Sequence, residues 1–488
     1  MLTRRRFVGY SALSSAMLAC PSWLRSAFAQ TPSGTAQPPL RLAILGSVYH
    51  PGSNLQTIGD RFLVGYPYEG DWHMPNVQVV SMYVDQRVRK ADAAPTGYQR
   101  AMSGAESRSQ KPHDSPHPPI AQTAQKSHVQ MTRVVQSAEP ENPGPNTDLS
   151  ESRSQAFGFR LCRNIPEALR CGGSRIAVDA VLAIAEQGGD HPYPSNDVGQ
   201  ILLPTYDWFQ QCTEVFEEEN HPLPYFNHKQ LSFSFPEAQN MVKTAERLNF
   251  PLLAGSSMPV TWRLPGVDIP LGAPLQEAVM VGVGRFDGMD FDALDAMQCM
   301  LERRKGGETG VKAVQLLEGD DVWAARKAGR WSEDLMSSAL SRSDTPLGLT
   351  VLDGRTQDLA APGVLKQLVP DPAAYCVEYN DGTRATLLML NGAIRDFNIS
   401  SRVAGHGLVS TQFFMPPAPN QTYSACLAAK IEQMYRSGNA PYPVQRTLLT
   451  TGLLEACLSS RHRLNQRLET PQLAISYRPP AESQYART

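Results

Sequence analysis

A loop near the start of the chain combines glycine, serine and histidine in a way that would suit an anion. It runs Gly46-Ser-Val-Tyr-His-Pro-Gly-Ser53 and lies between a predicted buried strand and a predicted helix over residues 54–63. The backbone N–H groups at the start of a helix favour phosphate. Gly46, His50, Gly52 and Ser53 are therefore candidate binding residues.

Three acidic residues offer further chemistry. Asp85 directly follows a predicted strand over residues 77–84 and would accept hydrogen bonds from ligand hydroxyls, although it would equally suit an ordinary turn. Asp292 and Asp295 are three residues apart in a predicted helix over residues 287–304, so they lie on one helix face and could act as a carboxylate pair. The alternative is structural, because the helix dipole favours acidic residues near a helix start.

The elements that must position these residues alternate in the first half of the chain. Strands are predicted over residues 40–45, 77–84, 176–184, 224–226 and 252–255, and helices over 54–63, 150–157, 165–169, 208–219 and 236–248. This alternation predicts a doubly wound α/β sheet of the Rossmann type, with its ligand at the carboxyl ends of the strands. After about residue 260 the pattern changes. An Asn-Asp-Gly turn at residues 380–382 joins two strand-like runs, which indicates an α+β domain with a mainly antiparallel sheet.

Composition narrows the classes of function. Lys+Arg 45 against Asp+Glu 47 gives a net charge of −2, which argues against a nucleic-acid partner. Residues 91–150 are rich in Pro, Ser, Gln and Ala, so we expect them to form a disordered insertion. His113, His117 and His128 lie in this insertion, where a metal role is possible, although histidines in flexible Pro-rich chain are usually solvated. His50, His73, His191, His221 and His228 show no metal-ligand spacing. We therefore expect no metal.

The first 29 residues read as an export signal. Arg4-Arg5-Arg6-Phe7 precedes a modestly apolar run, and Ala27-Phe28-Ala29 offers a cleavage point, which together are typical of a twin-arginine signal peptide. The sequence predicts an exported or periplasmic protein that engages the twin-arginine translocation machinery. Cleavage after Ala29 would remove four arginines and no acidic residue, lowering the net charge from −2 to −6. Export of an already folded chain disfavours disulfides, so we expect buried free thiols.

Several local motifs together resemble the Gfo/Idh/MocA oxidoreductases, which are sugar and cyclitol dehydrogenases. Phe226-Asn-His-Lys229 stands where that family has Glu-Lys-Pro after a strand, and Phe250-Pro-Leu-Leu-Ala-Gly255 matches its next strand. Glu378-Tyr379 with Asp381-Gly382 matches its hairpin. The resemblance covers nearly all of the chain that follows the expected signal peptide, except the insertion. It implies a Rossmann-like dinucleotide-binding domain over residues 38–259 and a C-terminal α+β domain with an open sheet over residues 260–480.

The resemblance also implies a cofactor and site residues. NAD or NADP would place its pyrophosphate at the loop of residues 46–53 and its ribose at Asp85, although the loop lacks the Gly-x-Gly-x-x-Gly pattern. Lys229 corresponds to the catalytic lysine of the family, and Asp292 stands where the family has a catalytic histidine, with Asp295 beside it. Trp262 and Arg263 lie where the substrate loop begins, with a packed tryptophan and a surface arginine as the alternative.

Two classes of function remain open on these grounds. The first is an exported oxidoreductase that uses a nicotinamide cofactor on a sugar-like or cyclitol-like small molecule. The second is a ligand-binding or assembly protein that keeps the fold and has lost the redox site, which the altered glycine loop and the missing histidine favour. The family's habit of associating through its C-terminal sheet further implies a homo-oligomer.

Overall fold

The structure is a computed structural model, and it describes residues 38–86, 147–188, 192–284, 287–347, 359–361, 363–416 and 420–487. Leu40–Thr488 form one compact unit that contains two large sheets. The export signal expected over residues 1–29 lies outside the described residues, as does the expected insertion up to residue 146, with its three histidines. Both remain predictions.

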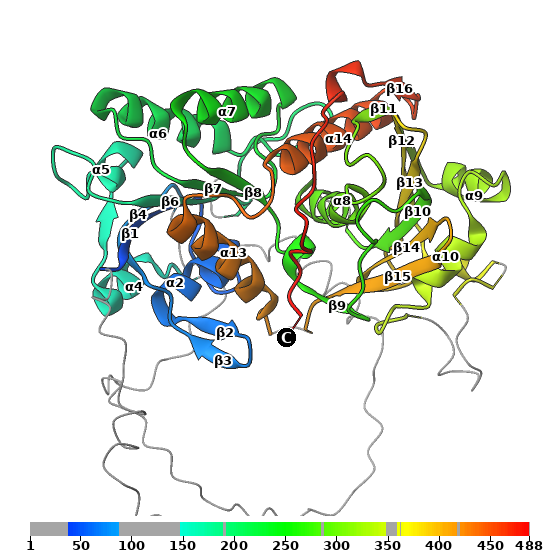
Figure 1. Cartoon of the computed structure of the whole chain (residues 1–488), viewed down its shortest axis with the longest axis horizontal. Coiled ribbons are helices and arrows are strands. Elements are labelled where there is room, and N and C mark those ends of the chain that lie inside the picture. The colour runs from blue at the N-terminus through cyan, green and yellow to red at the C-terminus, as the bar shows by residue number, and fades with distance from the viewer. Residues whose placement is uncertain are drawn as a thin grey trace, which may run out of the picture. The chain divides into compact units, whose positions relative to one another are not determined.

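The first sheet has six parallel strands, as the alternating pattern predicted (Figure 1). Their order across the sheet is β5 (Arg160–Cys162), β4 (Val77–Val84), β1 (Leu40–Gly46), β6 (Ala180–Ile184), β7 (Tyr225–His228) and β8 (Leu252–Gly255). The strand order reverses at β1, which is the arrangement of a Rossmann-type sheet. All neighbouring strands pair in parallel, so their carboxyl ends lie along one edge.

Helices cover both faces of this sheet (Figure 1). Three helices bury apolar side chains against one face: α5 (Ile165–Leu169), α6 (Thr205–Glu219) and α7 (Phe235–Leu248). The other face packs against η1 (Leu55–Gly59), α2 (Arg61–Val64) and α13 (Tyr423–Ser437). Because both faces are covered, the strands carry nearly continuous apolar runs.

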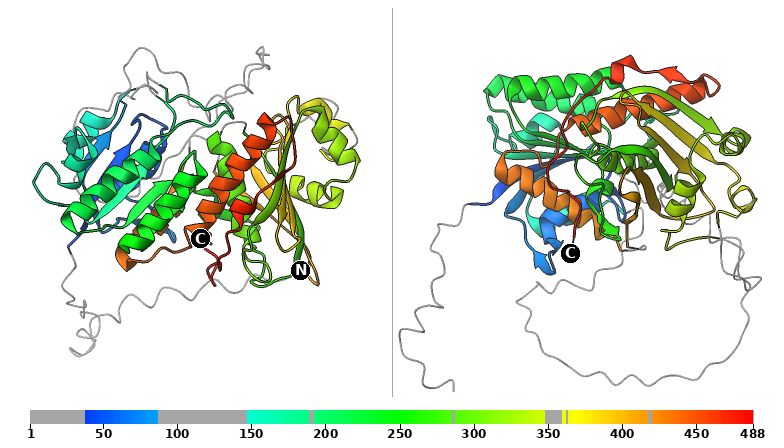
Figure 2. Two further views of the ribbon diagram at one scale, coloured as in Figure 1. Left: turned by 90° about the horizontal axis from the view of Figure 1, so that it is seen from above. Right: turned by 45° about the vertical axis from the view of Figure 1, so that its right-hand side comes forward.

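The second sheet has eight strands and is mainly antiparallel (Figure 2). Their order is β16 (Leu468–Glu469), β11 (Val311–Glu318), β12 (Ala373–Tyr379), β13 (Arg384–Met389), β10 (Leu275–Gly282), β14 (Phe397–Val403), β15 (Gly407–Phe414) and β9 (Trp262–Leu264). The predicted hairpin is present as β12 and β13, which pair antiparallel across Asp381 and Gly382. Only β10 and β13 pair in parallel among the described strands of this sheet. The predicted fold class is thereby confirmed.

Both faces of the second sheet are also covered. One face packs against α8 (Asp287–Leu301) and α14 (Gln445–His462). The outer face packs against three short helices: α9 (Asp320–Lys327), α10 (Glu333–Leu340) and α12 (Val364–Leu368). Trp331, Leu335 and Met336 are buried in that outer layer. The sheet is open, with β16 and β9 as its edge strands. The expected homo-oligomer through this sheet remains a prediction.

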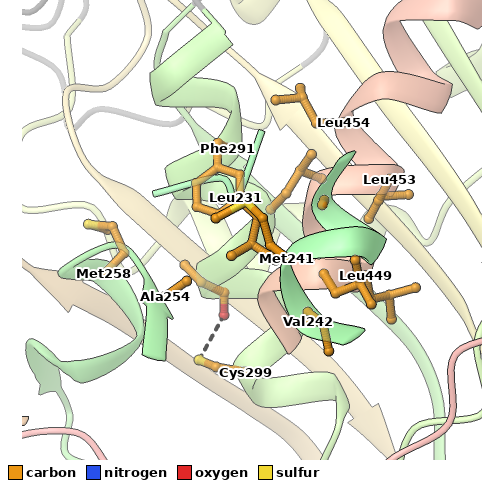
Figure 3. Packing of buried hydrophobic residues seen from close by; sticks show 14 of the residues in the cluster. Leu231, Met241, Val242, Ala254, Met258, Phe291, Cys299, Leu449, Leu453 and Leu454 are labelled. Atoms are coloured by element: carbon orange, nitrogen blue, oxygen red, sulfur yellow. Dashed lines mark hydrogen bonds between the residues drawn. The ribbon is translucent and has the colours of Figure 1, made fainter. Parts of the chain in front are cut away.

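A shared core lies between the two sheets. Leu231, Met241, Phe291 and Leu453 come from the segments around α7, α8 and α14 and are all fully buried (Figure 3). The helix α13 belongs to the second half of the sequence, yet it packs on the first sheet. The chain therefore crosses back over the boundary that was expected near residue 260.

Local details depart from the sequence predictions in several places. The strand predicted over residues 176–184 begins only at Ala180, and β5 was not predicted. The helix expected over residues 54–63 is interrupted at Asp60 into the short π-helix η1 and a single α-turn, α2. A two-stranded ribbon, β2 (Tyr66–Tyr68) with β3 (Asp71–His73), follows it and was not predicted. The seven cysteines beyond the expected signal are free thiols, as predicted, and all except Cys171 are buried.

Candidate functional site

The carboxyl edge of the parallel sheet collects most of the candidate residues. Strand β1 ends at Gly46, β4 is followed by Asp85, β7 by Lys229, and β8 ends at Gly255. Since ligands of such sheets lie beyond the carboxyl ends of the strands, this edge is the place to look for chemistry. Helix α8 comes from the second half of the chain and brings its acidic first turns to the same edge.

Lys229 forms the centre of this group. Its Nζ lies 2.9 Å from Oδ2 of Asp292 and also donates to the carbonyl of Gly288 at 3.1 Å. Lys229 adopts a left-handed backbone conformation with φ of 64°, and its own N–H donates to the carbonyl of Gly255 at 2.9 Å. A lysine in this conformation is strained, and such strain collects at functional sites. The side chains of Lys229 and Asp292 are each 19% exposed, so solvent reaches the pair.

The carboxylates of α8 surround this pair. Oδ2 of Asp295 accepts hydrogen bonds from the N–H and the hydroxyl of Ser256, both at 2.9 Å. Oδ2 of Asp287 accepts from the N–H of Ile201 at 3.1 Å. Burial raises the pKa of Asp287 and that of Asp295 to about 6 in each case. The pKa of Asp292 is also raised by burial, and the ammonium of Lys229 opposes that rise.

Several acceptor atoms in this group lack a partner. Oδ1 of Asp287, Oδ1 of Asp292 and Oε1 of Gln230 are buried and have no hydrogen-bond partner within the described ranges. Gln230 follows Lys229, and its Nε2 lies 3.4 Å from Oδ2 of Asp287. Unsatisfied buried acceptors are costly and rare in folded proteins. A ligand that donates several hydrogen bonds would satisfy them.

His228 precedes Lys229 and is buried. Burial lowers its pKa well below the usual value, and the charge of Lys229 acts in the same direction. The imidazole is therefore neutral at physiological pH. An uncharged side chain therefore directly precedes Lys229.

The loop after β1 is closely packed. A Cβ built on Gly46 would lie 2.3 Å from Cδ2 of Leu55, so any larger residue here would force the Leu55 side chain to move. The hydroxyl of Ser53 accepts from the N–H groups of His50 and Gln56, at 3.2 and 3.1 Å. Gly52 has a φ of 82°, which explains the second glycine of the loop. These residues shape the loop, and their side chains make contacts within it.

The amides that would receive a phosphate carry a carboxylate instead. Oε1 of Glu186, two residues beyond the end of β6, accepts from the N–H of Asn54 at 2.6 Å and from that of Leu55 at 3.3 Å. The hydroxyl of Ser47 exchanges two hydrogen bonds with the backbone of Glu186, at 2.9 and 2.8 Å. Burial raises the pKa of Glu186 to about 7, while the hydrogen bonds of Leu55 and Asn54 and the charge of Lys229 oppose the rise.

Asp85 is likewise engaged. Its two carboxylate oxygens accept from the hydroxyl of Tyr83 at 2.6 Å and from that of Tyr193 at 2.5 Å. The position and exposure of Asp85 fit a ribose. However, its carboxylate and the amides of Asn54 and Leu55, which a dinucleotide would use, already form hydrogen bonds within the chain. In this arrangement the residues do not fit a dinucleotide unless Glu186 moves.

The two proposed substrate residues lie elsewhere. Arg263 is buried, with Nη1 lying 3.0 Å from Oδ1 of Asp268 and the guanidinium stacked on the rings of Phe413 and Tyr485. Trp262 belongs to the edge strand β9 and packs against the core of the first sheet. No hydrogen bond or ion pair joins either residue to Lys229 among the described residues. Trp262 is packed, as its structural alternative stated, whereas Arg263 is buried and is not the surface arginine of its alternative.

Sequence reasoning missed Glu186, Tyr193 and Gln230. The signal for Glu186 was present, since an acidic residue directly beyond a buried strand in a parallel sheet must lie at the ligand edge. Asp287 was not among the predicted site residues either. Among the described residues no group of three or more His, Cys, Asp or Glu side chains could hold a metal ion, and no helix there is long and apolar enough to span a membrane.

Comparison with solved structures finds remote likenesses along most of the chain. A myo-inositol dehydrogenase from Corynebacterium glutamicum is 10% identical with a TM-score of 0.43, over 88% of this chain and 98% of that one. A probable dehydrogenase from Thermotoga maritima is 10% identical with a TM-score of 0.45, over 89% and 100%. A myo-inositol dehydrogenase from Lactobacillus casei in complex with NAD(H) and myo-inositol is 8% identical with a TM-score of 0.44, over 88% and 96%. No family model and no curated protein matches the chain. The fold assignment therefore rests on the strand order and pairing of the two sheets.

Proposed function

We propose that the chain is a divergent oxidoreductase of the Gfo/Idh/MocA type that acts on a hydroxyl group of a sugar-like or cyclitol-like molecule. The observation that carries this proposal is the pair formed by Lys229 and Asp292, 2.9 Å apart at the carboxyl edge of the parallel sheet. An ammonium and a carboxylate in contact, partly open to solvent, are the groups that proton transfer to and from an alcohol requires.

The unpartnered acceptors support a substrate rich in hydroxyl groups. Asp287, Asp292 and Gln230 each offer a buried oxygen that accepts no hydrogen bond from the described residues. A polyol presents several O–H donors on adjacent carbons and would satisfy them together. An anionic substrate would instead be repelled by the carboxylates of Asp287 and Asp292.

The two residues of the pair would have separate tasks. Oδ1 of Asp292 would accept the proton of the substrate hydroxyl, and its raised pKa suits a general base better than that of an ordinary aspartate. Lys229 would donate to the substrate oxygen and hold Asp292 in place. A nicotinamide dinucleotide, NAD or NADP, would supply the hydride acceptor for such a reaction if it bound after Glu186 had left the amides of Asn54 and Leu55.

The test is oxidation of a panel of polyols and sugars, followed through the absorbance of reduced nicotinamide. Lys229→Ala and Asp292→Asn should each lower kcat by about 100-fold or more. Lys243 is an exposed lysine of α7 and provides the control, since Lys243→Ala should leave the rate unchanged. If the Lys229→Ala variant kept the wild-type kcat, Lys229 and Asp292 would be excluded as the catalytic pair.

The contacts at the carboxyl edge of the parallel sheet, where a dinucleotide would bind, favour a second function. Glu186 and Tyr193 bind the groups that a dinucleotide needs, so the chain could equally be a ligand-binding or assembly protein that keeps the fold without redox chemistry. In that case polyol binding would persist without any binding of NAD(H) or NADP(H). Calorimetric titration with both ligand classes separates the two functions.

The export signal forms part of the proposal. The paired arginines and the Ala27-Phe28-Ala29 cleavage point support delivery by the twin-arginine machinery. Expression in a bacterial host followed by N-terminal sequencing of the periplasmic fraction should give Gln30 as the first residue. Arg4→Lys with Arg5→Lys should hold the precursor in the cytoplasm, whereas unchanged processing would argue against this route.

A further inference from the structure

The contacts of Glu186 imitate those of a bound phosphate. In parallel sheets with this strand order, the N–H groups that follow the β1 loop receive the pyrophosphate of a dinucleotide. Here the N–H groups of Asn54 and Leu55 donate to Oε1 of Glu186, and Nδ2 of Asn54 donates to Oε2 at 3.1 Å. A carboxylate and a phosphate are both oxygen anions, so they cannot occupy the same donors together.

A second and independent contact imitates a ribose. The acidic residue after the second strand accepts hydrogen bonds from ribose hydroxyls in dinucleotide-binding sheets. In this chain both oxygens of Asp85 already accept from hydroxyls, those of Tyr83 and Tyr193. Tyr193 is fixed by the side chain of Gln187, which accepts from its N–H at 2.8 Å and donates to its carbonyl at 2.9 Å. Gln187 is the residue next to Glu186, so the two contacts come from one side of the edge.

We propose that Glu186 and Tyr193 together act as an internal competitor of the nucleotide. They bind the amides and the carboxylate that pyrophosphate and ribose require, and a dinucleotide binds only after Glu186 has left Asn54 and Leu55. This inference rests on the proposed function, because it concerns the affinity of the same redox site. It makes Glu186 the residue that sets cofactor affinity.

The contact between Glu186 and the amides of Asn54 and Leu55 can be broken by a competing ligand. Among the described residues, two on the loop side, Asn54 and Leu55, donate hydrogen bonds to the carboxylate of Glu186, and Glu186 is partly buried. The charge of Lys229 acts on Glu186 and lowers its pKa, so the two groups interact electrostatically. Displacement of Glu186 by a nucleotide would therefore alter the charge around Lys229.

The experiment is isothermal titration calorimetry of the purified full chain with NAD(H) and with NADP(H). Glu186→Ala removes the carboxylate and frees the amides, and Glu186→Gln removes only the charge while keeping the shape. Tyr193→Phe frees one oxygen of Asp85. Glu214 is an exposed glutamate of α6, and Glu214→Ala is the matched control.

We expect Glu186→Ala to bind at least one of the two dinucleotides about tenfold or more tighter than the wild type, with Glu186→Gln intermediate and Glu214→Ala unchanged. Tyr193→Phe should give a smaller gain. Circular dichroism confirms that each variant is folded, and Glu186→Gln serves if Glu186→Ala does not fold.

The remaining outcomes distinguish the two proposals. If the wild type and both Glu186 variants bound a dinucleotide with equal and measurable affinity, the proposal that Glu186 competes with the nucleotide would be wrong. The proposed oxidoreductase function would be unaffected. Failure of every folded variant to bind either dinucleotide would overturn the competitor and also remove the cofactor from the proposed function.

Discussion

The ammonium of Lys229 lies 2.9 Å from the carboxylate of Asp292, and the chain holds it there from a left-handed backbone conformation with φ of 64°. The two residues are 63 positions apart and come from opposite halves of the chain. Residues other than Gly, Asn and Asp adopt this left-handed conformation only at a cost in conformational free energy. The position therefore retains a lysine where backbone energetics alone would select glycine.

This conformation predicts that two variants at position 229 will differ in stability but not in activity. Lys229→Gly and Lys229→Ala both remove the ammonium, but only glycine relieves the backbone strain. Lys229→Gly should therefore be more stable than Lys229→Ala by about 1 kcal/mol, measured by chemical denaturation. Both variants should lose activity equally. Equal stability of the two variants would show that the left-handed conformation carries no cost at this position.

Glu186 predicts a dependence of stability on pH. Its pKa is about 7 in the folded protein, above the ordinary value of 4.5. The folded state therefore keeps its proton where the unfolded state has lost it, so the contribution of this group is fully present below pH of about 4.5 and is lost as the pH rises through about 7.

The measurement is the difference in free energy of unfolding between Glu186→Gln and the wild type. This difference cancels the titration of groups such as His228, whose pKa shift acts in the opposite direction. Glu186→Gln should gain stability relative to the wild type between pH of about 5 and pH of about 8. A difference that stays constant over this range would mean that Glu186 titrates normally.

The parallel sheet could be predicted because its signal is local. Strands buried on both faces carry continuous apolar runs, and β4 and β8 have the bounds that their residues indicated. The approach of Asp292 to Lys229 was suggested only through the family resemblance, because α8 and β7 are distant in sequence. Contacts of that kind depend on how the two halves of the chain pack.

The contacts of Glu186 could not be predicted for a similar reason. They join residues 132 positions apart, and they depend on β6 lying beside β1, which no local pattern specifies. The helices that cover the outer face of the second sheet were also missed. The helices α9 and α10 are only eight residues long each, too short to show a sustained helical period in the sequence. Their packing is evident only once Trp331 and Leu335 are placed against the sheet.

A buried ion pair joins the two helices of the central layer and predicts a large loss of stability. Arg446 of α14 donates to Glu302, just after α8, through Nε at 2.8 Å and Nη2 at 2.5 Å, and both side chains are at most 2% exposed. Arg446→Ala should cost about 3–5 kcal/mol, because it leaves the Glu302 carboxylate buried without its partner.

The double variant Arg446→Met with Glu302→Leu removes both charges and should recover most of this loss in urea denaturation. Arg384 pairs with Glu277 at 3.5 Å and is 59% exposed, so Arg384→Ala is the control and should change stability by less than about 1 kcal/mol. Similar losses for the buried and the exposed pair would show that burial does not set the cost of breaking the Arg446–Glu302 pair.

Close contact between Gly46 and Leu55 yields the last prediction. A Cβ on Gly46 would lie 2.3 Å from Cδ2 of Leu55, and Leu55 is fully buried, so its side chain has little room to move. Gly46→Ala should destabilise the fold by about 1–3 kcal/mol through overpacking. Leu55→Ala should cost about 2–5 kcal/mol through the cavity it leaves. The double variant should cost less than the sum of the two, because the new methyl group then enters the space that Leu55 vacates. Thermal and urea unfolding of the three variants measure this coupling, and strict additivity would show that the glycine is not required by this contact.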